Sequence, residues 1–396
     1  MLNKRGLFSI PAFLFSGVFV GVLFLLLLST FPLAVESQIY KTLGIKKPHI
    51  IGFQPFWLLK RADKNYKPYL TTFTYFGLTL DSDGTIVKLV NPQEEEPGWT
   101  TLRGKSLEEK LNQAKKNRLK LSLLLHNSNE ASISALIKNP EKHANNLIAD
   151  VAPIMQKYGF ADLNLDIESF KKASESAQQQ FTAFVQEIKK GMDKNNLGTL
   201  TVEINPTALV KTRLANTKEL GKIADFLVLM AYDFHYINSY IAGPVAPIGG
   251  AGKAREYDVE TALKEMLNIV PAEKIILGIP LYGYEWETLG RKPGAPAIPG
   301  GGSIASHRRV SKLLANCDQC IKKVDALSRQ PHVIFPEPDN DYFHQIFYED
   351  EVSLEQKLEL AKKHKIAGVA LWALGYEGEK ILNPLEAYKR SVEWIK

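Results

Sequence analysis

The sequence contains very little cysteine: Cys317 and Cys320 are the only two among its 396 residues. They form a single Cys-x-x-Cys, with no second such pair and no neighbouring pair of histidines, so the four ligands of a structural zinc site are missing. We therefore expect no bound metal. Two interpretations of the pair stay open: a local disulfide in a part of the chain outside the cytoplasm, or two free thiols.

The sequence also lacks a strong excess of charge of one sign. Its 49 basic and 43 acidic residues leave a net charge of +6, and the basic residues are scattered, so no nucleic-acid partner is expected. HExxH and GxSxG motifs are absent. The glycine-rich stretch at residues 249–254 has Pro247 where a phosphate loop needs its first glycine, and Ala254 where it needs a hydroxyl. We expect no cofactor.

Charge is missing altogether from a long run near the N-terminus. Residues 7–35 contain no charged side chain and follow Lys4 and Arg5. The run is longer than the apolar core of a signal peptide, roughly 7–15 residues, and long enough for a membrane span of about 20 residues. We expect residues 1–36 to be a membrane anchor, with a cleaved signal peptide as the alternative, and residues 37–47 to be a tether. The basic residues favour a cytoplasmic N-terminus with the rest of the chain outside.

The rest of the chain, residues 48–396, alternates predicted strands and helices. Apolar and β-branched runs predict eight strands, at residues 50–53, 70–76, 119–125, 160–168, 200–204, 226–231, 274–281 and 366–372. Helical spacing of apolar residues predicts helices at 107–117, 132–158 with a break at Asn139-Pro140, 174–195, 217–223, 259–270, 349–363 and 382–395. Eight such units predict an α/β fold, a (β/α)8 TIM barrel, with an open doubly wound sheet as the alternative.

Two connections depart from this regular alternation. Residues 81–103 are rich in turn signals and are predicted to be mostly turns and loop. Residues 285–348, after the seventh strand, are too long for a simple crossover and combine a Gly- and Pro-rich loop at 293–302 with a helix-like piece and β-rich segments. We expect a small α+β insertion there. It would form one wall of the substrate cleft, unless it is a surface excursion without functional weight.

The strand at residues 160–168 places Asp162, Asn164, Asp166 and Glu168 on one side and apolar residues on the other. An edge strand with one face in water would alternate in the same way. This strand, however, lies between two helical segments and so belongs to a parallel sheet, in which both faces are usually covered. Acids on a covered face are costly unless they have a role, and barrel enzymes hold their chemistry at the C-terminal ends of the strands. We predict an active site here.

The same stretch resembles the fourth-strand signature of glycoside hydrolase family 18, Asp-Gly-x-Asp-x-Asp-x-Glu. Asp166 and Glu168 match its last two acids, whereas Asn164 stands where the family usually has Asp, and Ala161-Asp162 replaces Asp-Gly. Three later segments resemble the sixth, seventh and eighth strands of the family in the right order: Met230-Ala231-Tyr232-Asp233, residues 279–283 and residues 368–372. Together these segments cover roughly residues 48–390.

The resemblance implies a retaining glycosidase that acts on β-1,4-linked N-acetylglucosamine with assistance from the substrate. Glu168 would be the acid, Asp166 would orient the acetamido group and stabilise the oxazolinium ion, and Tyr232 would donate a hydrogen bond to the acetamido oxygen. The candidate substrate-binding residues are Asn164, Met230, Asp233, Tyr282 and Trp372. Trp57 and Trp286 are given no role. We expect a monomer.

The residues themselves fit this chemistry. Glycoside hydrolysis needs an acid and a second group that stabilises the cationic carbon. Asp166 lies about 6–7 Å from Glu168 along the strand, which is not the place of a partner across the sugar ring, and its nearness should raise one pKa of the pair and keep Glu168 protonated. Chitin-like oligomers and peptidoglycan strands are both candidate substrates. A non-catalytic carbohydrate-binding protein on the same barrel is the main alternative, and a barrel with unrelated chemistry is another.

Overall fold

The computed structural model describes residues 45–391 and 393–394 in two units. In the smaller unit, strand β1 (Ile45–Lys46) pairs antiparallel with β17 (Glu393–Trp394). The larger unit comprises residues 48–390 and carries the barrel. The predicted membrane segment at 1–36 lies outside the described residues. Within the described ranges, no helix combines the length and apolar character that crossing a membrane requires.

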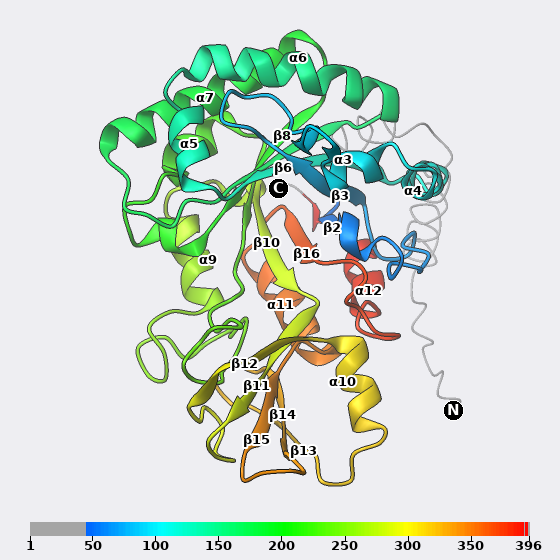
Figure 1. Cartoon of the computed structure of the whole chain (residues 1–396), viewed down its shortest axis with the longest axis vertical. Helices are drawn as coiled ribbons and strands as arrows, with labels where there is room; N and C mark the ends of the chain where they lie inside the picture. Colours follow the sequence, from blue (N-terminus) through cyan, green and yellow to red (C-terminus); the bar gives the residue numbers. More distant parts are fainter. Residues whose placement is uncertain (1–44, 392, 395–396) are drawn as a thin grey trace, which may run out of the picture. The chain divides into compact units, whose positions relative to one another are not determined.

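Eight parallel strands close into a barrel, which confirms the predicted fold class (Figure 1). In chain order the strands are β2 (His49–Pro55), β3 (Thr72–Thr79), β6 (Lys120–Asn127), β7 (Asp162–Ile167), β8 (Thr199–Ile204), β9 (Phe226–Leu229), β10 (Ile275–Pro280) and β16 (Gly368–Trp372). Strand β10 pairs with β9 on one side and with β16 on the other, and β16 pairs with β2. This closure excludes the open doubly wound sheet.

Helices connect the strands on the outside of the barrel. They are α3 (Pro97–Leu102), α4 (Lys105–Lys116), α5 (Glu130–Leu136), α6 (Pro140–Tyr158), α7 (Glu175–Lys194), α8 (Thr217–Ile223), α9 (Val259–Leu267), α11 (Glu351–Lys363) and α12 (Pro384–Arg390), with 3-10 turns η1 (Phe56–Leu58), η2 (Pro206–Leu209) and η3 (Ala272–Lys274). Their ends follow from local sequence. The Ser174 side chain caps α7 by accepting from the Ala177 N–H, and Gly159 ends α6 with a left-handed φ of 73°. The break predicted at Asn139-Pro140 is confirmed, because Asn139 precedes α6 and Pro140 is its first residue.

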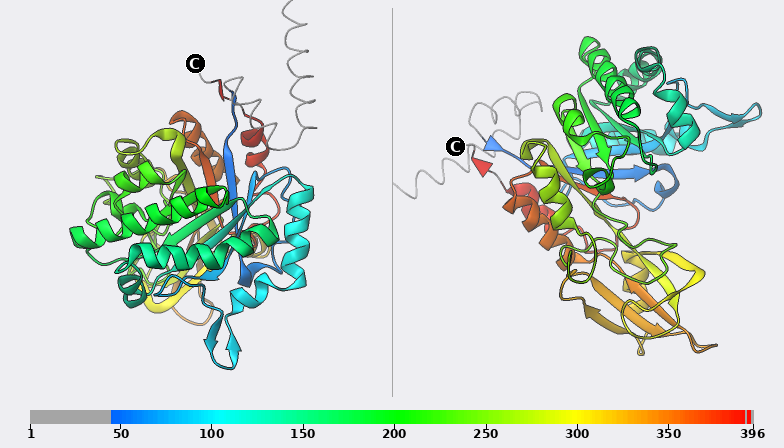
Figure 2. Two further views of the ribbon diagram at one scale, coloured as in Figure 1. Left: turned by 90° about the horizontal axis from the view of Figure 1, so that it is seen from above. Right: turned by 90° about the vertical axis from the view of Figure 1, so that its left-hand side faces the viewer.

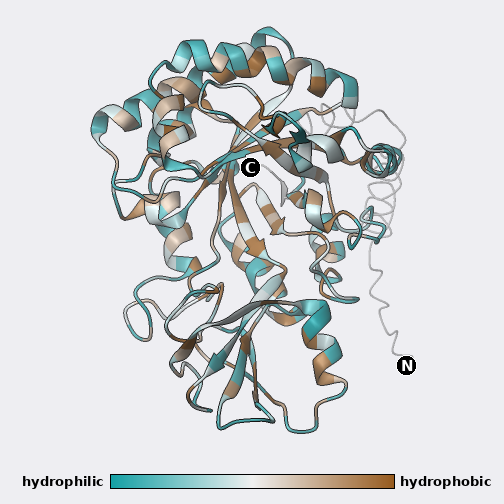
Figure 3. Ribbon diagram, in the orientation of Figure 1, coloured by the Kyte–Doolittle hydropathy of each residue, from teal (hydrophilic) through white to brown (hydrophobic). Residues whose placement is uncertain are grey.

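The alternation along each strand separates two sets of side chains. On β7 and β8, Leu163, Leu165 and Val202 are buried in the core between the strands and the helices, together with Phe181 and Ile188 of α7. Figures 1 and 2 show α6 and α7 side by side outside these strands. Figure 3 shows hydrophobic residues concentrated along the barrel strands. The other set of side chains points into the barrel, where the site is found.

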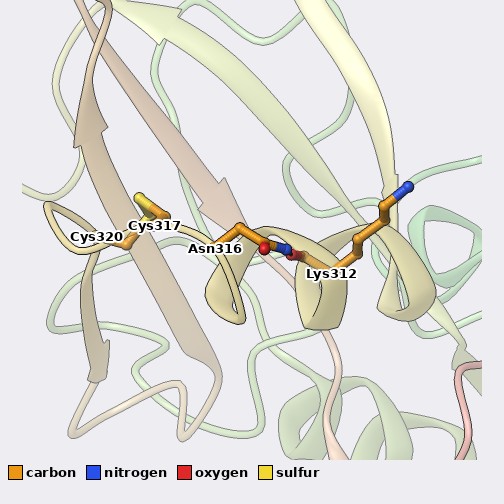
Figure 4. Close-up of a disulfide and its surroundings, with 4 residues drawn as sticks. All are labelled: Lys312, Asn316, Cys317 and Cys320. Atoms are coloured by element: carbon orange, nitrogen blue, oxygen red, sulfur yellow. Dashed lines mark hydrogen bonds between the residues drawn. A yellow bond between two sulfur atoms is a disulfide. The ribbon is translucent and has the colours of Figure 1, made fainter.

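The connection after β10 forms a five-stranded antiparallel sheet of order β12-β11-β15-β14-β13 (Figure 1, lower part). Its elements are β11 (Tyr282–Thr288), β12 (Ala297–Ser306), α10 (His307–Leu314), β13 (Ile321–Val324), β14 (Pro331–Pro336) and β15 (Phe343–Phe347). Cys317 and Cys320 form a disulfide between α10 and β13 (Figure 4). Beside it, the Asn316 side-chain amide donates to the Lys312 carbonyl at 2.8 Å. Of the two interpretations of this pair, the structure has the disulfide.

Three predicted elements are wrong. The loop predicted at 293–302 is partly β12, which glycine and proline permit because β12 is the edge strand of its sheet. The turns predicted at 81–103 include β4 (Leu89–Asn91), β5 (Glu94–Glu95) and α3, which the Glu96 side chain caps by accepting from the Trp99 N–H. The last helix ends at Arg390 instead of 395, and residues 393–394 form β17.

A buried ion pair ties the insertion to the barrel. Lys357 of α11 lies 2.7 and 2.9 Å from the two carboxyl oxygens of Glu349, and neither side chain is exposed. The Gln330 side chain donates to Glu349 at 2.8 Å and accepts from the Ala246 N–H at 2.9 Å. The segment before β14 is therefore bonded both to Glu349, which precedes α11, and to the loop that follows β9.

Candidate active site

The inward face of β7 begins with Asp162, which is fully partnered. It accepts hydrogen bonds from Ser122 of β6 at 2.6 Å and from Thr201 of β8 at 3.0 Å. Lys120 lies 3.8 Å away. These bonds join three neighbouring strands at the N-terminal end of β7, away from the end where barrel enzymes hold their chemistry. Asp162 therefore has a structural role.

Further along the same face, Asn164 and Asp166 are buried but largely unpaired. Asn164 is 0 % exposed and Asp166 8 %. Neither amide atom of Asn164, nor Oδ1 of Asp166, has a hydrogen-bond partner in the described part of the chain. Burial, and next the negative charge of Glu168, raise the pKa of Asp166 well above its ordinary value. Unpaired polar atoms are costly in a core, so this pattern is typical of a site built for a polar ligand.

Glu168 follows the end of β7 and is half-buried, with its N–H donating to the Asn127 carbonyl at 2.9 Å. Burial raises the pKa of Glu168, and the negative charge of Asp233 raises it further. The sequence analysis predicted this raised pKa but attributed it to the charge of Asp166. In the structure, the causes are burial and the charge of Asp233. A carboxyl that holds its proton to higher pH is suited to act as a general acid.

Met230, Tyr232 and Asp233 come from the segment after β9. The Met230 N–H donates to the Ile204 carbonyl at 3.0 Å. Gly278 of β10 leaves room for this segment, because a Cβ there would lie 2.7 Å from the Leu229 carbonyl oxygen and 3.0 Å from the Tyr232 ring. Burial is the largest cause of a raised Tyr232 pKa, and the surrounding acids, Asp166, Asp233 and Glu168 among them, add to it. The structure thus brings Tyr232 and Asp233 together with the β7 acids.

Asp233 is held by two tyrosines of the insertion. The hydroxyls of Tyr282 and Tyr284 both donate to its Oδ1. The backbone of Asp233 is left-handed, with φ 59°. Asp233 is exposed to solvent, but the surrounding protein partly desolvates its carboxyl group and raises its pKa. The insertion therefore supplies side chains that orient a residue of the barrel site.

Trp372 ends β16 within an aromatic group. Its ring centroid lies 4.9 Å from that of Phe76 and 6.3 Å from that of Trp57, and its carbonyl accepts from the Leu281 N–H at 2.7 Å. Trp57 is 48 % exposed, so part of its side chain remains accessible to a ligand. Trp57, which the sequence analysis left without a role, therefore belongs with Trp372. Trp286, in contrast, is buried in the core of the insertion.

Two further residues near the acids were missed in the sequence. Tyr284 bonds Asp233, and Glu203 of β8 lies buried inside the barrel. The signal for Glu203 was present, because Thr201 and Glu203 alternate with apolar residues as the acids of β7 do. In the part of the chain that the structure describes, no group of three or more His, Cys, Asp or Glu side chains is arranged to hold a metal ion.

Comparison with known proteins identifies the family. The family model for "Glycosyl hydrolases family 18" matches residues 60–377. The cortical fragment-lytic enzyme of Bacillus subtilis (strain 168) is 25 % identical over 323 residues, which cover 80 % of this chain and 67 % of that enzyme.

Two solved structures show the same fold. The spore cortex-lytic enzyme SleL of Bacillus megaterium QM B1551 has a TM-score of 0.66 and 21 % identity, covering 86 % of this chain and 74 % of that one. A mutant chitinase from Cycas revoluta, solved in complex with (GlcNAc)4, has a TM-score of 0.71 and 17 % identity, covering 87 % and 100 %. Because the family model matches most of the chain, the protein belongs to the glycosyl hydrolases of family 18 and is a glycoside hydrolase.

Proposed function

We propose that the protein hydrolyses β-1,4-linked N-acetylglucosamine glycans with retention of configuration, by a substrate-assisted route. The observation that carries the proposal is the pair formed by Glu168 and Asp166, which share one face at the end of β7 and both have a raised pKa. Asp166 lies about 6–7 Å back along the strand. At that distance Asp166 faces the acetamido group of the sugar and not the anomeric carbon. Asp166 is therefore not the nucleophile, and the acetamido oxygen takes that role.

In the first step Glu168 donates its proton to the leaving glycosidic oxygen. The acetamido carbonyl oxygen forms a bond to the anomeric carbon as the glycosidic bond breaks, which gives an oxazolinium ion. Asp166 orients the acetamido N–H and balances the positive charge, and Tyr232 donates a hydrogen bond to the acetamido oxygen. Water then attacks the anomeric carbon and breaks its bond to the acetamido oxygen, while Glu168 accepts a proton from the water, and the product leaves in the β configuration.

The remaining site residues bind the sugar. Asp233, oriented by Tyr282 and Tyr284, accepts from a sugar hydroxyl. Trp372 offers an apolar ring face on which a sugar stacks, and Trp57 extends that surface. Asn164 and Met230 line the floor beside Asp166 and Tyr232. The insertion walls this side of the cleft.

The substrate is a chitin-like oligomer or a peptidoglycan strand, and relatives support each: the Bacillus enzymes are named for spore cortex lysis, and the Cycas protein is a chitinase. The test measures turnover on N-acetylglucosamine oligomers and on purified peptidoglycan, with the anomer of the first product read by proton NMR. We expect the β anomer. An inverted product, or a covalent sugar on Asp166 or Glu168, would contradict the substrate-assisted route.

We further propose that this activity is extracytoplasmic, that residues 1–36 anchor a monomeric enzyme in the membrane, and that the catalytic unit is outside. The uncharged run after Lys4 and Arg5 supports the anchor. The Cys317–Cys320 disulfide supports an oxidising compartment, where such bonds persist.

A further inference from the structure

Glu203 is a buried carboxyl for which the proposed mechanism has no role. It is 6 % exposed, and neither of its carboxyl oxygens accepts a hydrogen bond from an N–H or O–H group among residues 45–391 and 393–394. An ionised carboxylate in such a place is strongly disfavoured unless it is paired. Glu203 is therefore either a neutral acid or a charge that some ligand compensates.

The strand register places Glu203 beside Asp166. Asn164 of β7 pairs with Thr201 of β8 and Leu165 pairs with Val202, so Asp166 and Glu203 are the next residues on the two parallel strands. The bond from Thr201 to Asp162 shows that this set of side chains points into the barrel. Because side chains alternate along a strand, Asp166 and Glu203 point inward as neighbours.

The groups that face Glu203 repel a second negative charge. Asp166, Glu168 and Asp162 act on it from β7 and its end, Tyr232 faces it from the segment after β9, and its pairing partner on β9 is the apolar Val228. Burial is the largest cause that raises the pKa of Glu203 well above its ordinary value, and the Asp166 charge is the next. The Asn164 amide opposes this shift, although it lies outside ordinary hydrogen-bond geometry. Two such carboxyls in one desolvated site do not both ionise.

We propose that Glu203 is a positioning residue that stays a neutral carboxylic acid and donates its O–H to Asp166, so that the single negative charge of the pair rests on Asp166. The role rests on the proposed function, because that charge is the one that meets the oxazolinium ion. Glu203 keeps its proton throughout, and the one proton exchanged in each step passes through Glu168. In this way β8 supplies the carboxyl partner that Asn164, as an amide, does not offer.

The first test needs no substrate. The carbonyl stretch of a protonated carboxylic acid is recorded by infrared spectroscopy on the purified protein at pH 7. We expect the Glu203→Gln variant to lose one protonated-carboxyl band relative to the wild type. The matched control is Glu285→Gln, which replaces a buried carboxyl whose pKa is lowered by bonds to His344 and Arg309, and it should lose none. An unchanged band in Glu203→Gln means that Glu203 is ionised, which overturns the proposal whether or not the substrate is correctly identified.

The second test compares Glu203→Gln with Glu203→Met in the pH profile of kcat/KM. The amide still donates to Asp166, so the acidic limb should stay in place. Methionine removes the donor that favours ionised Asp166, so the pKa of Asp166 rises and the acidic limb moves up by about one pH unit. If Glu203 were ionised, both variants would remove a negative charge beside Asp166, and the acidic limb of kcat/KM would move to lower pH. If Glu203 only filled space, the acidic limb would stay in place in both variants. Either result overturns the proposal.

Discussion

At the residue scale, the proposed chemistry depends on Glu168 holding a proton that it can release to the leaving oxygen. Glu168→Gln removes this proton but keeps the shape of the side chain. We expect kcat to fall by about 10²–10⁴-fold, the usual contribution of a positioned acid, while binding of an N-acetylglucosamine oligomer changes little. Steady-state kinetics and calorimetry measure the two effects. Glu108→Gln, on an exposed position of α4, is the control and should leave both unchanged.

The electrostatic influence of Asp233 on Glu168 gives a prediction with a defined sign. The negative charge of Asp233 raises the pKa of Glu168, so Asp233→Asn should lower it. Since activity requires protonated Glu168 and is lost as pH rises through its pKa, the alkaline limb of kcat/KM should move to lower pH. Asp318→Asn, exposed in the insertion, should leave the limb in place. If the alkaline limb of kcat/KM does not move in Asp233→Asn, the charge of Asp233 does not act on Glu168.

The functional role of a residue could be predicted from the sequence only where the pattern that indicates it lies within a few neighbouring residues. Asp166 and Glu168 lie two residues apart, at the end of β7 and just after it, and their alternation with apolar residues alone predicts an inward acidic face. Glu203 shows the same alternation on β8, but its meaning depends on the register between two strands separated by α7. Tyr284 reaches Asp233 across 51 positions of sequence, and nothing local to either residue predicts that contact.

At the scale of elements, the buried pair between Glu349 and Lys357 fixes α11 to the segment that precedes it. Lys357→Met leaves the Glu349 carboxyl without its cation, and we expect a loss of about 3–5 kcal/mol in the free energy of unfolding. Burial already raises the pKa of Glu349, and the loss of Lys357 would raise it further, so the loss should grow as pH rises through the raised pKa that Glu349 has in the wild type. Urea denaturation at several pH values measures both effects.

The control for this change lies on the same helix. Lys362 pairs with Glu359 at 2.7 Å, but both side chains are well exposed, so Lys362→Met should cost less than about 1 kcal/mol. Equal losses in the two variants would contradict a special role for the buried pair.

The elements predicted correctly from the sequence are those in which one buried face sets the spacing of the apolar residues. All eight barrel strands and the long helix α7 are of this kind. The elements predicted wrongly depend on distant partners. β12 forms because it pairs with β11, β17 because it pairs with β1, and α3 packs so closely that a Cβ on Gly98 would lie 1.6 Å from the Gly77 carbonyl oxygen.

At the scale of the whole molecule, the proposed anchor predicts where the enzyme is found. We expect the intact chain to fractionate with membranes and its catalytic unit to be accessible to protease added from outside. A chain that begins at residue 37 serves as the control, and it should be released from membranes with its activity unchanged. Recovery of a soluble natural product that begins after residue 34 would instead establish a cleaved signal peptide.

The bonds among Gln330, Glu349 and Lys357 also bear on how this chain can change over generations. Glu349 lies at the end of the insertion, Lys357 lies on the barrel helix α11, and Gln330 lies just before β14. A deletion that removed Gln330 and Glu349 together would leave the Lys357 ammonium group in an apolar interior, whereas one that spared Glu349 would leave its carboxyl short of a donor. Loss of the insertion in a single genetic step is therefore penalised, and least so where Glu349 and its pairing with Lys357 are kept.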